Sequence, residues 1–294
     1  MKGLLLFLVA CMIWSCSTTK PLNQSVAKGY IPVKDSKIYY EAVGQGDPIV
    51  LLHAGFLDHT MWQPQVEALK SKYRVITLDM PAHGLSERGK DTFLIAEALA
   101  TVLDSLQLPK ASWMGLSLGA VAVTDFLIAH PERVNKAILV SPGINGYETK
   151  YPLDSFTRQY FPNLMKALEQ KDTAGAAEVF TQAWGDGPFR PAATVDQAMR
   201  SYVYNTTLAT MYKFKISGWP RLQRPPAIER IHEINVPLLI IAGDKDMPYI
   251  LDASEVLHRT VPGAQKIILP DVAHMLNMEK PDAFNKVILD FLAN

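Results

Sequence analysis

Gly115-Leu116-Ser117-Leu118-Gly119 decides the fold, because it joins an apolar stretch, residues 112–114, to a helical pattern, residues 118–129. The first segment predicts a buried strand, and the second predicts a helix that ends before Pro131. A serine on such a sharp strand-to-helix turn has a strained backbone, and glycines two residues to either side allow close approach of neighbouring elements. The sequence therefore predicts that Ser117 is a nucleophile held above a sheet.

Strands and helices alternate on both sides of this turn, which predicts an α/β fold. We expect a mostly parallel central sheet with helices on both faces. Ile38-Tyr39-Tyr40 and the hairpin-like Gly44-Gln45-Gly46-Asp47-Pro48 predict antiparallel strands at the beginning of the sheet. The later strands are predicted at residues 49–52, 74–78, 136–140, 236–241 and 267–269.

The alternation stops between residues 144 and 228, where the chain has helical tendency and no convincing buried strand. Of the 27 aromatic residues, 13 lie between Tyr147 and Trp219. This enrichment predicts a helical lid with an apolar lining, inserted after the sixth strand into a core formed by residues 29–143 and 229–294. The alternative is that these side chains form only a small core of the lid itself.

Two further strand ends carry the groups that a serine nucleophile requires, namely a base and an acid that orients it. One predicted strand runs into Gly243-Asp244-Lys245-Asp246, and the next runs into Asp271-Val272-Ala273-His274. Because the carboxyl ends of parallel strands meet at one edge of a sheet, Ser117, Asp246 and His274 can come together. We prefer Asp246 to Asp244 as the acid, since Asp244 follows Gly243 so closely that it more naturally shapes the turn.

The tetrahedral intermediate of such a reaction also needs hydrogen-bond donors for its oxyanion. His53-Ala54-Gly55-Phe56 follows the strand at residues 49–52 and could present the backbone N–H of Phe56. The second donor would be the backbone N–H of Leu118. His53 is interpreted as structural because it opens this turn.

Several motifs resemble the α/β-hydrolase superfamily, and the resemblance covers nearly all of the mature chain. One departure is Ala82, where the family usually has glycine. The resemblance implies a triad of Ser117, Asp246 and His274 and an oxyanion hole formed by Phe56 and Leu118. Serine at the nucleophile position argues against a haloalkane dehalogenase or an epoxide hydrolase. The matching stretches are Met61-Trp62-Gln63-Pro64-Gln65, Leu78-Asp79-Met80-Pro81-Ala82-His83-Gly84-Leu85-Ser86, Ala129-His130-Pro131-Glu132-Arg133-Val134, and His274 followed by Asn277, Glu279 and Pro281.

Two other stretches resemble the enol-lactone hydrolase and carboxylesterase-like branch of this superfamily. They are Gly185-Asp186-Gly187-Pro188 and Gly243-Asp244-Lys245-Asp246-Met247-Pro248. The expected activity is hydrolysis of a carboxylic ester or lactone, a small-molecule substrate, through an acyl-enzyme on Ser117. The alternatives are a carbon–carbon bond hydrolase or perhydrolase with the same triad, and a receptor-like protein that binds a ligand with little turnover.

The N-terminal residues 1–16 have the pattern of a signal peptide, with Lys2 followed by an apolar stretch. Ile13-Trp14-Ser15-Cys16 resembles a bacterial lipoprotein box, which predicts lipidation of Cys16, a polar tether at residues 17–28 and anchoring to a membrane of the cell envelope. Leu8-Val9-Ala10-Cys11 also fits such a box but leaves a very short apolar region before it. The alternative is a secreted protein in which Cys16 is coincidental.

Composition argues against other classes of function. The 294 residues include 29 Lys and Arg and 29 Asp and Glu, so the net charge is zero and nucleic acid is not an expected partner. The remaining histidines are scattered without paired metal-ligand spacing, and no cysteine follows Cys16. We therefore expect no metal, no cofactor and no disulfide in the mature protein.

Overall fold

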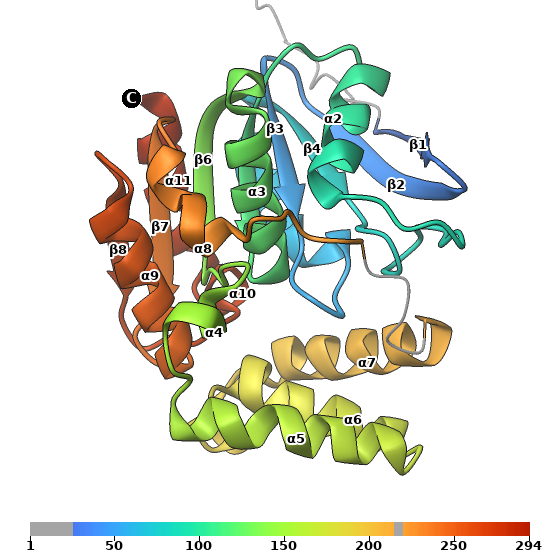
Figure 1. Ribbon diagram of the computed structural model, residues 1–294, viewed down its shortest axis with the longest axis vertical. Helices are drawn as coiled ribbons and strands as arrows, with labels where there is room; N and C mark the ends of the chain where they lie inside the picture. The colour runs from blue at the N-terminus through green and yellow to red at the C-terminus, as the bar shows by residue number, and fades with distance from the viewer. Residues whose placement is uncertain (1–25, 215–219) are drawn as a thin grey trace, which may run out of the picture.

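The computed structural model describes residues 26–214 and 220–294, and within them eight strands form one sheet in the order β1-β2-β4-β3-β5-β6-β7-β8 (Figure 1). β1 pairs antiparallel with β2, and β2 antiparallel with β4, whereas all other neighbours are parallel. The predicted α/β fold with a mostly parallel sheet is confirmed. The strands are Ala27–Val33, Ser36–Val43, Asp47–Leu52, Tyr73–Leu78, Ala111–Leu116, Val134–Val140, Leu238–Gly243 and Gln265–Leu269.

The hairpin predicted at Gly44-Gln45-Gly46-Asp47-Pro48 is wrong, because β4 lies between β2 and β3 and pairs with both. Gly44 has a φ of 85°, and a Cβ atom there would lie 2.3 Å from the carbonyl oxygen of Tyr73. Glycine therefore allows the connection to pass close to the start of β4. The actual first hairpin joins β1 to β2, and β1 begins at Ala27, inside the segment predicted as a tether.

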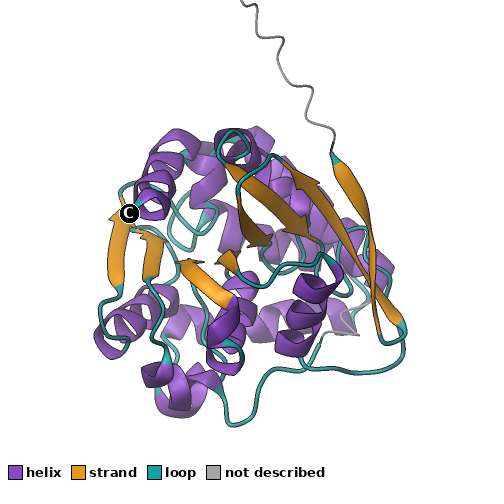
Figure 2. Cartoon of the chain, turned by 90° about the horizontal axis from the view of Figure 1, so that it is seen from above, coloured by secondary structure: helices purple, strands orange, loops and turns teal. Residues whose placement is uncertain are grey.

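Alternate residues of the central strands face two hydrophobic cores, one on each side of the sheet. In β3, Val50 and Leu52 face the core that contains α2 and α3, whereas Ile49 and Leu51 face the core that contains α1 and α11. Figure 2 shows helices on both faces of the sheet. The bounds of these helices are α1 Gln63–Leu69, α2 Ile95–Ser105, α3 Leu118–Ala129, α9 Pro248–Thr260, α10 Leu276–Glu279 and α11 Pro281–Ala293.

A helical segment separates β6 from β7, and Figure 1 shows α5, α6 and α7 together at one end of the molecule. We call residues 144–228 the insertion. Asp154 caps α5 by accepting hydrogen bonds from the backbone N–H groups of Phe156 and Thr157. The elements of the insertion are α4 Tyr147–Lys150, α5 Ser155–Glu169, α6 Thr173–Phe180, the π-helical turn Thr181–Asp186, the 3-10 turn Ala192–Thr194 and α7 Gln197–Phe214, followed by α8 Ala227–Arg230, which begins inside the insertion and ends beyond it.

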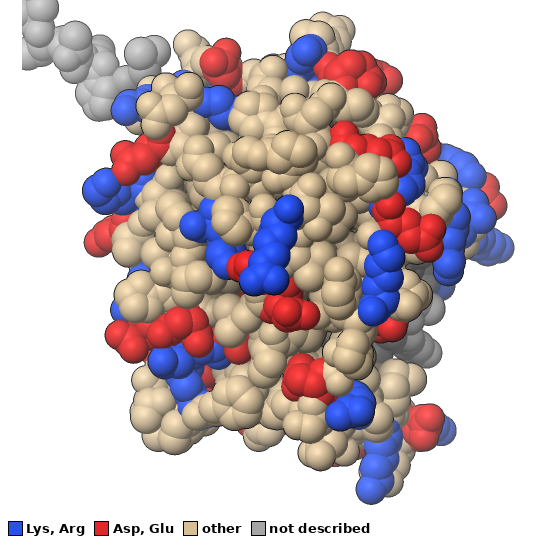
Figure 3. All heavy atoms as spheres, turned by 60° about the vertical axis from the view of Figure 1, so that its left-hand side comes forward, with Lys and Arg blue, Asp and Glu red and all other residues tan. Residues whose placement is uncertain are grey.

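The surface of the described residues carries charges of both signs. On the face shown in Figure 3, basic and acidic side chains are interspersed with broad uncharged areas. In the described parts of the chain, no helix combines the length and the apolar character needed to cross a membrane. The predicted signal peptide and Cys16 lie outside the described residues.

Candidate active site

Ser117 lies between β5 and α3, where the chain turns sharply from strand to helix. Its φ of 56° and ψ of −110° are a strained combination for a residue with a side chain. A Cβ atom on Gly115 would lie 2.3 Å from the carbonyl oxygen of Gly119, and one on Gly119 would lie 2.3 Å from that of Leu52. The two glycines are therefore required for β5, α3 and β3 to meet closely around Ser117. The backbone N–H of Ser117 donates to the carbonyl oxygen of Val140 at 3.0 Å, and this hydrogen bond connects the turn to β6.

Asp246 and His274 come together in the structure although 28 positions separate them in the sequence. Asp246 follows β7 and His274 follows β8, and Nδ1 of His274 donates to the two carboxylate oxygens at 2.9 and 3.0 Å. Both side chains are buried. Nε2 of His274 is also buried and has no hydrogen-bond partner among the described residues, so its lone pair is available to accept a proton.

Asp244 has a different environment. Its carboxylate pairs with Lys245 at 3.1 Å, and its side chain is 32% exposed. Hydrogen bonds from Lys245 and from the backbone, although opposed by partial burial, lower the pKa of the Asp244 carboxyl below its usual range. The geometry thus favours Asp246 over Asp244 as the partner of His274.

A cavity of about 220 Å³ brings Ser117 and His274 to one space. Phe56 and Leu118, whose backbone N–H groups are the predicted oxyanion donors, line the same cavity. Phe56 has a φ of 61°, and Leu118 is the first residue of α3, where the helix dipole favours negative charge. Ser117, His274, Phe56 and Leu118 therefore share one cavity, with Asp246 directly behind His274.

Trp184 is a residue of this site that sequence reasoning did not single out. The π-helical turn of the insertion places its ring 4.3 Å, centroid to centroid, from the ring of His274. The Nε1–H of Trp184 donates to the hydroxyl of Tyr160 at 2.7 Å, and burial raises the pKa of the Tyr160 hydroxyl. The only sequence signal for these side chains was the aromatic enrichment of residues 147–219.

Glu279 connects the insertion to the segment that carries His274. Its Oε1 accepts from the backbone N–H of Ala273 at 2.8 Å, and its Oε2 accepts from Nη1 of Arg190 at 2.6 Å. Arg190 also donates from Nε to the carbonyl oxygen of Asp186. Glu279 belonged to a quoted motif without an assigned role, and no motif pointed to Arg190.

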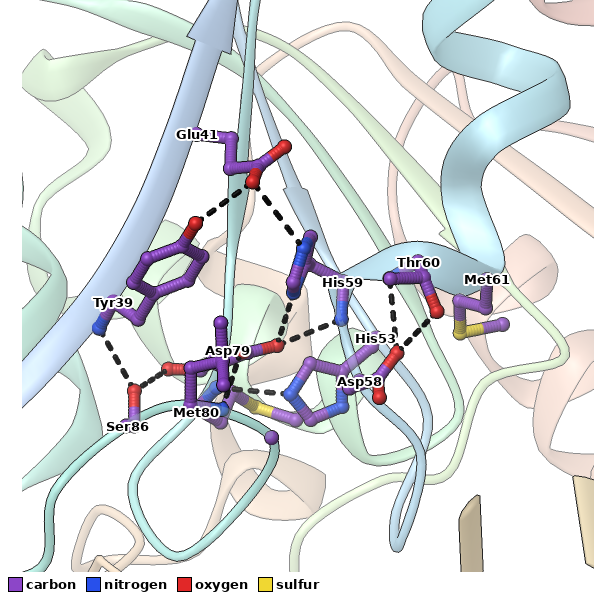
Figure 4. A network of polar contacts seen from close by, with 12 residues as sticks. Tyr39, Glu41, His53, Asp58, His59, Thr60, Met61, Asp79, Met80 and Ser86 are labelled. Atoms are coloured by element: carbon purple, nitrogen blue, oxygen red, sulfur yellow. Dashed lines mark hydrogen bonds and ion pairs between the residues drawn. The ribbon is translucent and has the colours of Figure 1, made fainter. Parts of the chain in front are cut away.

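Asp79, directly after β4, connects its own loop to the segment after β3 that contains Phe56 and His59 (Figure 4). This fully buried carboxylate accepts from the backbone and Nδ1 of His59 and from the backbone of Leu85. Burial opposes its charge, but these hydrogen bonds lower the pKa of Asp79 below its usual value. Nε2 of His53 accepts from the backbone N–H of Met80 at 2.9 Å, and its Nδ1 donates to the carbonyl oxygen of Ala54 at 2.7 Å. These two hydrogen bonds fit the neutral form of the ring, and burial lowers the pKa of His53.

Among residues 26–214 and 220–294, no group of three or more His, Cys, Asp or Glu side chains is arranged to hold a metal ion.

Known proteins resemble this chain in sequence and in fold. A family model described as alpha/beta hydrolase fold matches residues 47–281. The chain is similar to the carboxylesterase YbfK of Bacillus subtilis (strain 168), with 27% identity over 275 residues that cover 90% of this chain and 86% of that protein. The crystal structure of that carboxylesterase superposes with a TM-score of 0.73 at 24% identity, over 91% of this chain and 92% of that chain.

Two other relatives are named for different reactions. A 2-hydroxy-6-oxononadienedioate/2-hydroxy-6-oxononatrienedioate hydrolase of Escherichia coli (strain K12) is 27% identical over 293 residues, covering 93% of this chain and 98% of that protein. The enol-lactonase of Burkholderia xenovorans LB400 superposes with a TM-score of 0.70 at 22% identity, over 90% of this chain and all of that chain.

Proposed function

Because the chain belongs to the α/β-hydrolase fold family, we propose that it hydrolyses a carboxylic ester or lactone through an acyl-enzyme on Ser117. The observation that carries the proposal is the single cavity lined by the strained Ser117 and by His274, whose Nδ1 is hydrogen-bonded to the buried Asp246. The similarity to a carboxylesterase and an enol-lactonase supports this substrate class.

In the proposed reaction, Oγ of Ser117 attacks the carbonyl carbon while Nε2 of His274 takes its proton. Asp246 stabilises the imidazolium and holds the ring with Nδ1 protonated. The negative oxygen of the tetrahedral intermediate accepts hydrogen bonds from the backbone N–H groups of Phe56 and Leu118. His274 then gives its proton to the leaving alkoxide, and the acyl group remains on Ser117.

The second half of the reaction repeats these steps with water as the nucleophile. His274 removes a proton from water, the resulting hydroxide attacks the acyl-enzyme, and the collapse of the second intermediate returns the proton to Ser117 and releases the acid. No cofactor enters either half, because proton transfer and charge stabilisation come from side chains and backbone N–H groups.

Ser117→Ala tests the proposal, with Ser105→Ala, an exposed serine at the end of α2, as the matched control. A fluorophosphonate should label wild type and Ser105→Ala stoichiometrically and leave Ser117→Ala unlabelled. Turnover of short and medium acyl esters and lactones should be lost with the label. Wild-type turnover in Ser117→Ala would overturn the assignment of the nucleophile.

A carbon–carbon bond hydrolase with the same triad is the second candidate, because the Escherichia coli relative is as similar in identity as the carboxylesterase. That relative is named for dioates, which carry two carboxylates. Product analysis after incubation with a dienedioate and with a simple ester separates the two candidates.

We propose further that Cys16 is lipidated and anchors the protein to a membrane of the cell envelope, with secretion as the alternative. The apolar stretch after Lys2 and the residues Ile13-Trp14-Ser15-Cys16 support this proposal. Expression in a bacterial host with a radioactive fatty acid should label the wild type and leave Cys16→Ser unlabelled, while Cys11→Ser keeps the label. Wild-type protein without label would overturn the proposed anchor.

A further inference from the structure

The walls of the catalytic cavity consist of uncharged side chains. None of the described residues that line it is Arg, Lys, Asp or Glu. Core and insertion both contribute apolar or aromatic surface to the space around Ser117 and His274. The apolar and aromatic side chains of this wall include Leu118, Val121, Tyr160, Leu164, Phe180 and Trp184.

Two arginines of the insertion form ion pairs and do not line the catalytic cavity. Arg190 pairs with Glu279 through Nη1, whereas its Nη2 is buried without a hydrogen-bond partner among the described residues. Arg200 pairs with Asp186 at 2.9 Å and with Glu178. Arg190 lines a separate cavity of about 370 Å³ rather than the catalytic one. The carboxylate directly behind His274 is that of Asp246, so a second anion entering the catalytic cavity would meet a charge of the same sign.

The cavity is partly open to solvent, and its volume indicates the size of the group that it can bury. An apolar cavity of about 150 Å³ accepts a benzene molecule. The space of about 220 Å³ beside Ser117 therefore has room for an aromatic ring with a few further atoms, or for a branched chain of similar volume.

We infer that this site selects esters or lactones whose acyl part is uncharged and compact, and that it rejects acyl parts ending in a carboxylate. The inference rests on the proposed function and narrows its substrate class. A carboxylate buried against the apolar wall of this cavity would lose part of its hydration without gaining a cationic partner among the residues that line it, which disfavours binding. The inference also disfavours the dioates of the second candidate function.

Three ethyl esters of matched shape test the inference, because isopropyl, carboxamide and carboxylate groups are nearly isosteric. They are ethyl 5-methylhexanoate, ethyl 4-carbamoylbutanoate and monoethyl glutarate. The purified protein is assayed for ethanol released at neutral pH, and kcat/KM is compared within one preparation. We expect kcat/KM to fall in the order given, with the carboxylate ester about a hundredfold below the isopropyl-ended ester.

The outcomes separate failure of the inference from failure of the proposed function. A ratio above tenfold between the isopropyl-ended and the carboxylate esters supports the inference. A ratio below tenfold, with clear hydrolysis of both, overturns it and leaves the proposed function standing. Absence of hydrolysis together with absence of fluorophosphonate labelling overturns the proposed function, and the inference fails with it.

Phe161 allows the converse experiment, because it lines the catalytic cavity and is 44% exposed. A cation placed there can keep contact with water while its charge reaches the cavity. Phe161→Arg should raise kcat/KM for the carboxylate ester relative to the carboxamide ester by about tenfold. Phe161→Gln removes the ring without adding charge and serves as the control. Because the ratio of two substrates does not depend on the folded fraction, partial misfolding does not obscure the result, and an unchanged ratio would contradict the inference.

Discussion

Glu279→Gln tests how strongly the insertion is coupled to the segment that carries His274. The substitution keeps the size of the side chain and one carbonyl oxygen, which can still accept from the backbone of Ala273. It removes the negative charge and turns an N–H₂ group toward Arg190, whose guanidinium then lacks its carboxylate.

The expected loss of stability follows from burial. The side chains of Arg190 and Glu279 are 17% and 9% exposed, so this is a largely buried ion pair. Breaking a buried pair by removing one partner costs about 3 to 5 kcal/mol. Because Arg190 keeps some contact with water, we expect the lower end, about 3 kcal/mol, together with a roughly tenfold lower kcat from a less well positioned His274.

Glu233→Gln is the matched control, because Arg230 and Glu233 form an ion pair whose side chains are 29% and 41% exposed. Exposed pairs contribute little because water screens them, so this variant should keep nearly all of its stability and its activity. Urea unfolding gives the free energies of unfolding, and turnover of an ester substrate gives kcat.

The double variant Arg190→Met/Glu279→Gln distinguishes the stability lost with the ion pair itself from the cost of leaving the buried Arg190 without a carboxylate partner. Methionine fills similar space without a charge, so the double variant should recover part of the stability lost by Glu279→Gln. An equal loss in Glu279→Gln and Glu233→Gln, with kcat unchanged in both, would refute the coupling.

Three further predictions concern the turn, the acid and a buried histidine. Asp246→Asn should lower kcat by about 10⁴, whereas Asp244→Asn should change it less than about threefold, and the opposite ranking in steady-state kinetics would transfer the acid role. Gly119→Ala should destabilise the fold by at least about 3 kcal/mol in urea unfolding because its Cβ would meet β3, whereas Gly263→Ala, with open space around it, should lose only about 1 kcal/mol. Burial lowers the pKa of His83 to about 3, so between that value and about 6.5 the unfolded chain binds a proton that the folded protein does not. His83 alone should therefore lower the stability by about 1.4 kcal/mol per unit as pH decreases through this window, and other buried groups such as His53 add their own contributions. In urea unfolding, the slope of stability against pH should be smaller by about that amount in His83→Asn.

The fold was predictable because local signals agreed along most of the chain. The helix expected at residues 118–129 is α3, with the same bounds, and the strands around it pair in parallel as the alternation implies. The hairpin predicted at Gly44 is wrong for a reason that the spacing of residues along the sequence cannot reveal. Strand order is decided by long-range pairing, and β4, although later in the sequence, separates β2 from β3.

The chemistry at the strand ends was predictable for a similar reason, since parallel strands bring their carboxyl ends to one edge. That rule places Asp246 and His274 near each other without any knowledge of the insertion. It gives no information on Trp184 or Arg190. Their positions depend on how the helices of the insertion pack on one another and on the core, and the sequence shows only the abundance of aromatic residues there.

The insertion consequently has two roles in the proposed mechanism. Its residues Tyr160 and Trp184 form part of the cavity wall against which the acyl group would lie. Its Arg190 pairs with Glu279, which in turn accepts a hydrogen bond from the backbone of the segment that carries His274. Substrate selection and positioning of the base thus depend on the same helices. A substitution inside the insertion that shifts Trp184 therefore changes both the shape of the cavity and the surroundings of His274, so its effect on kcat and its effect on substrate preference should occur together.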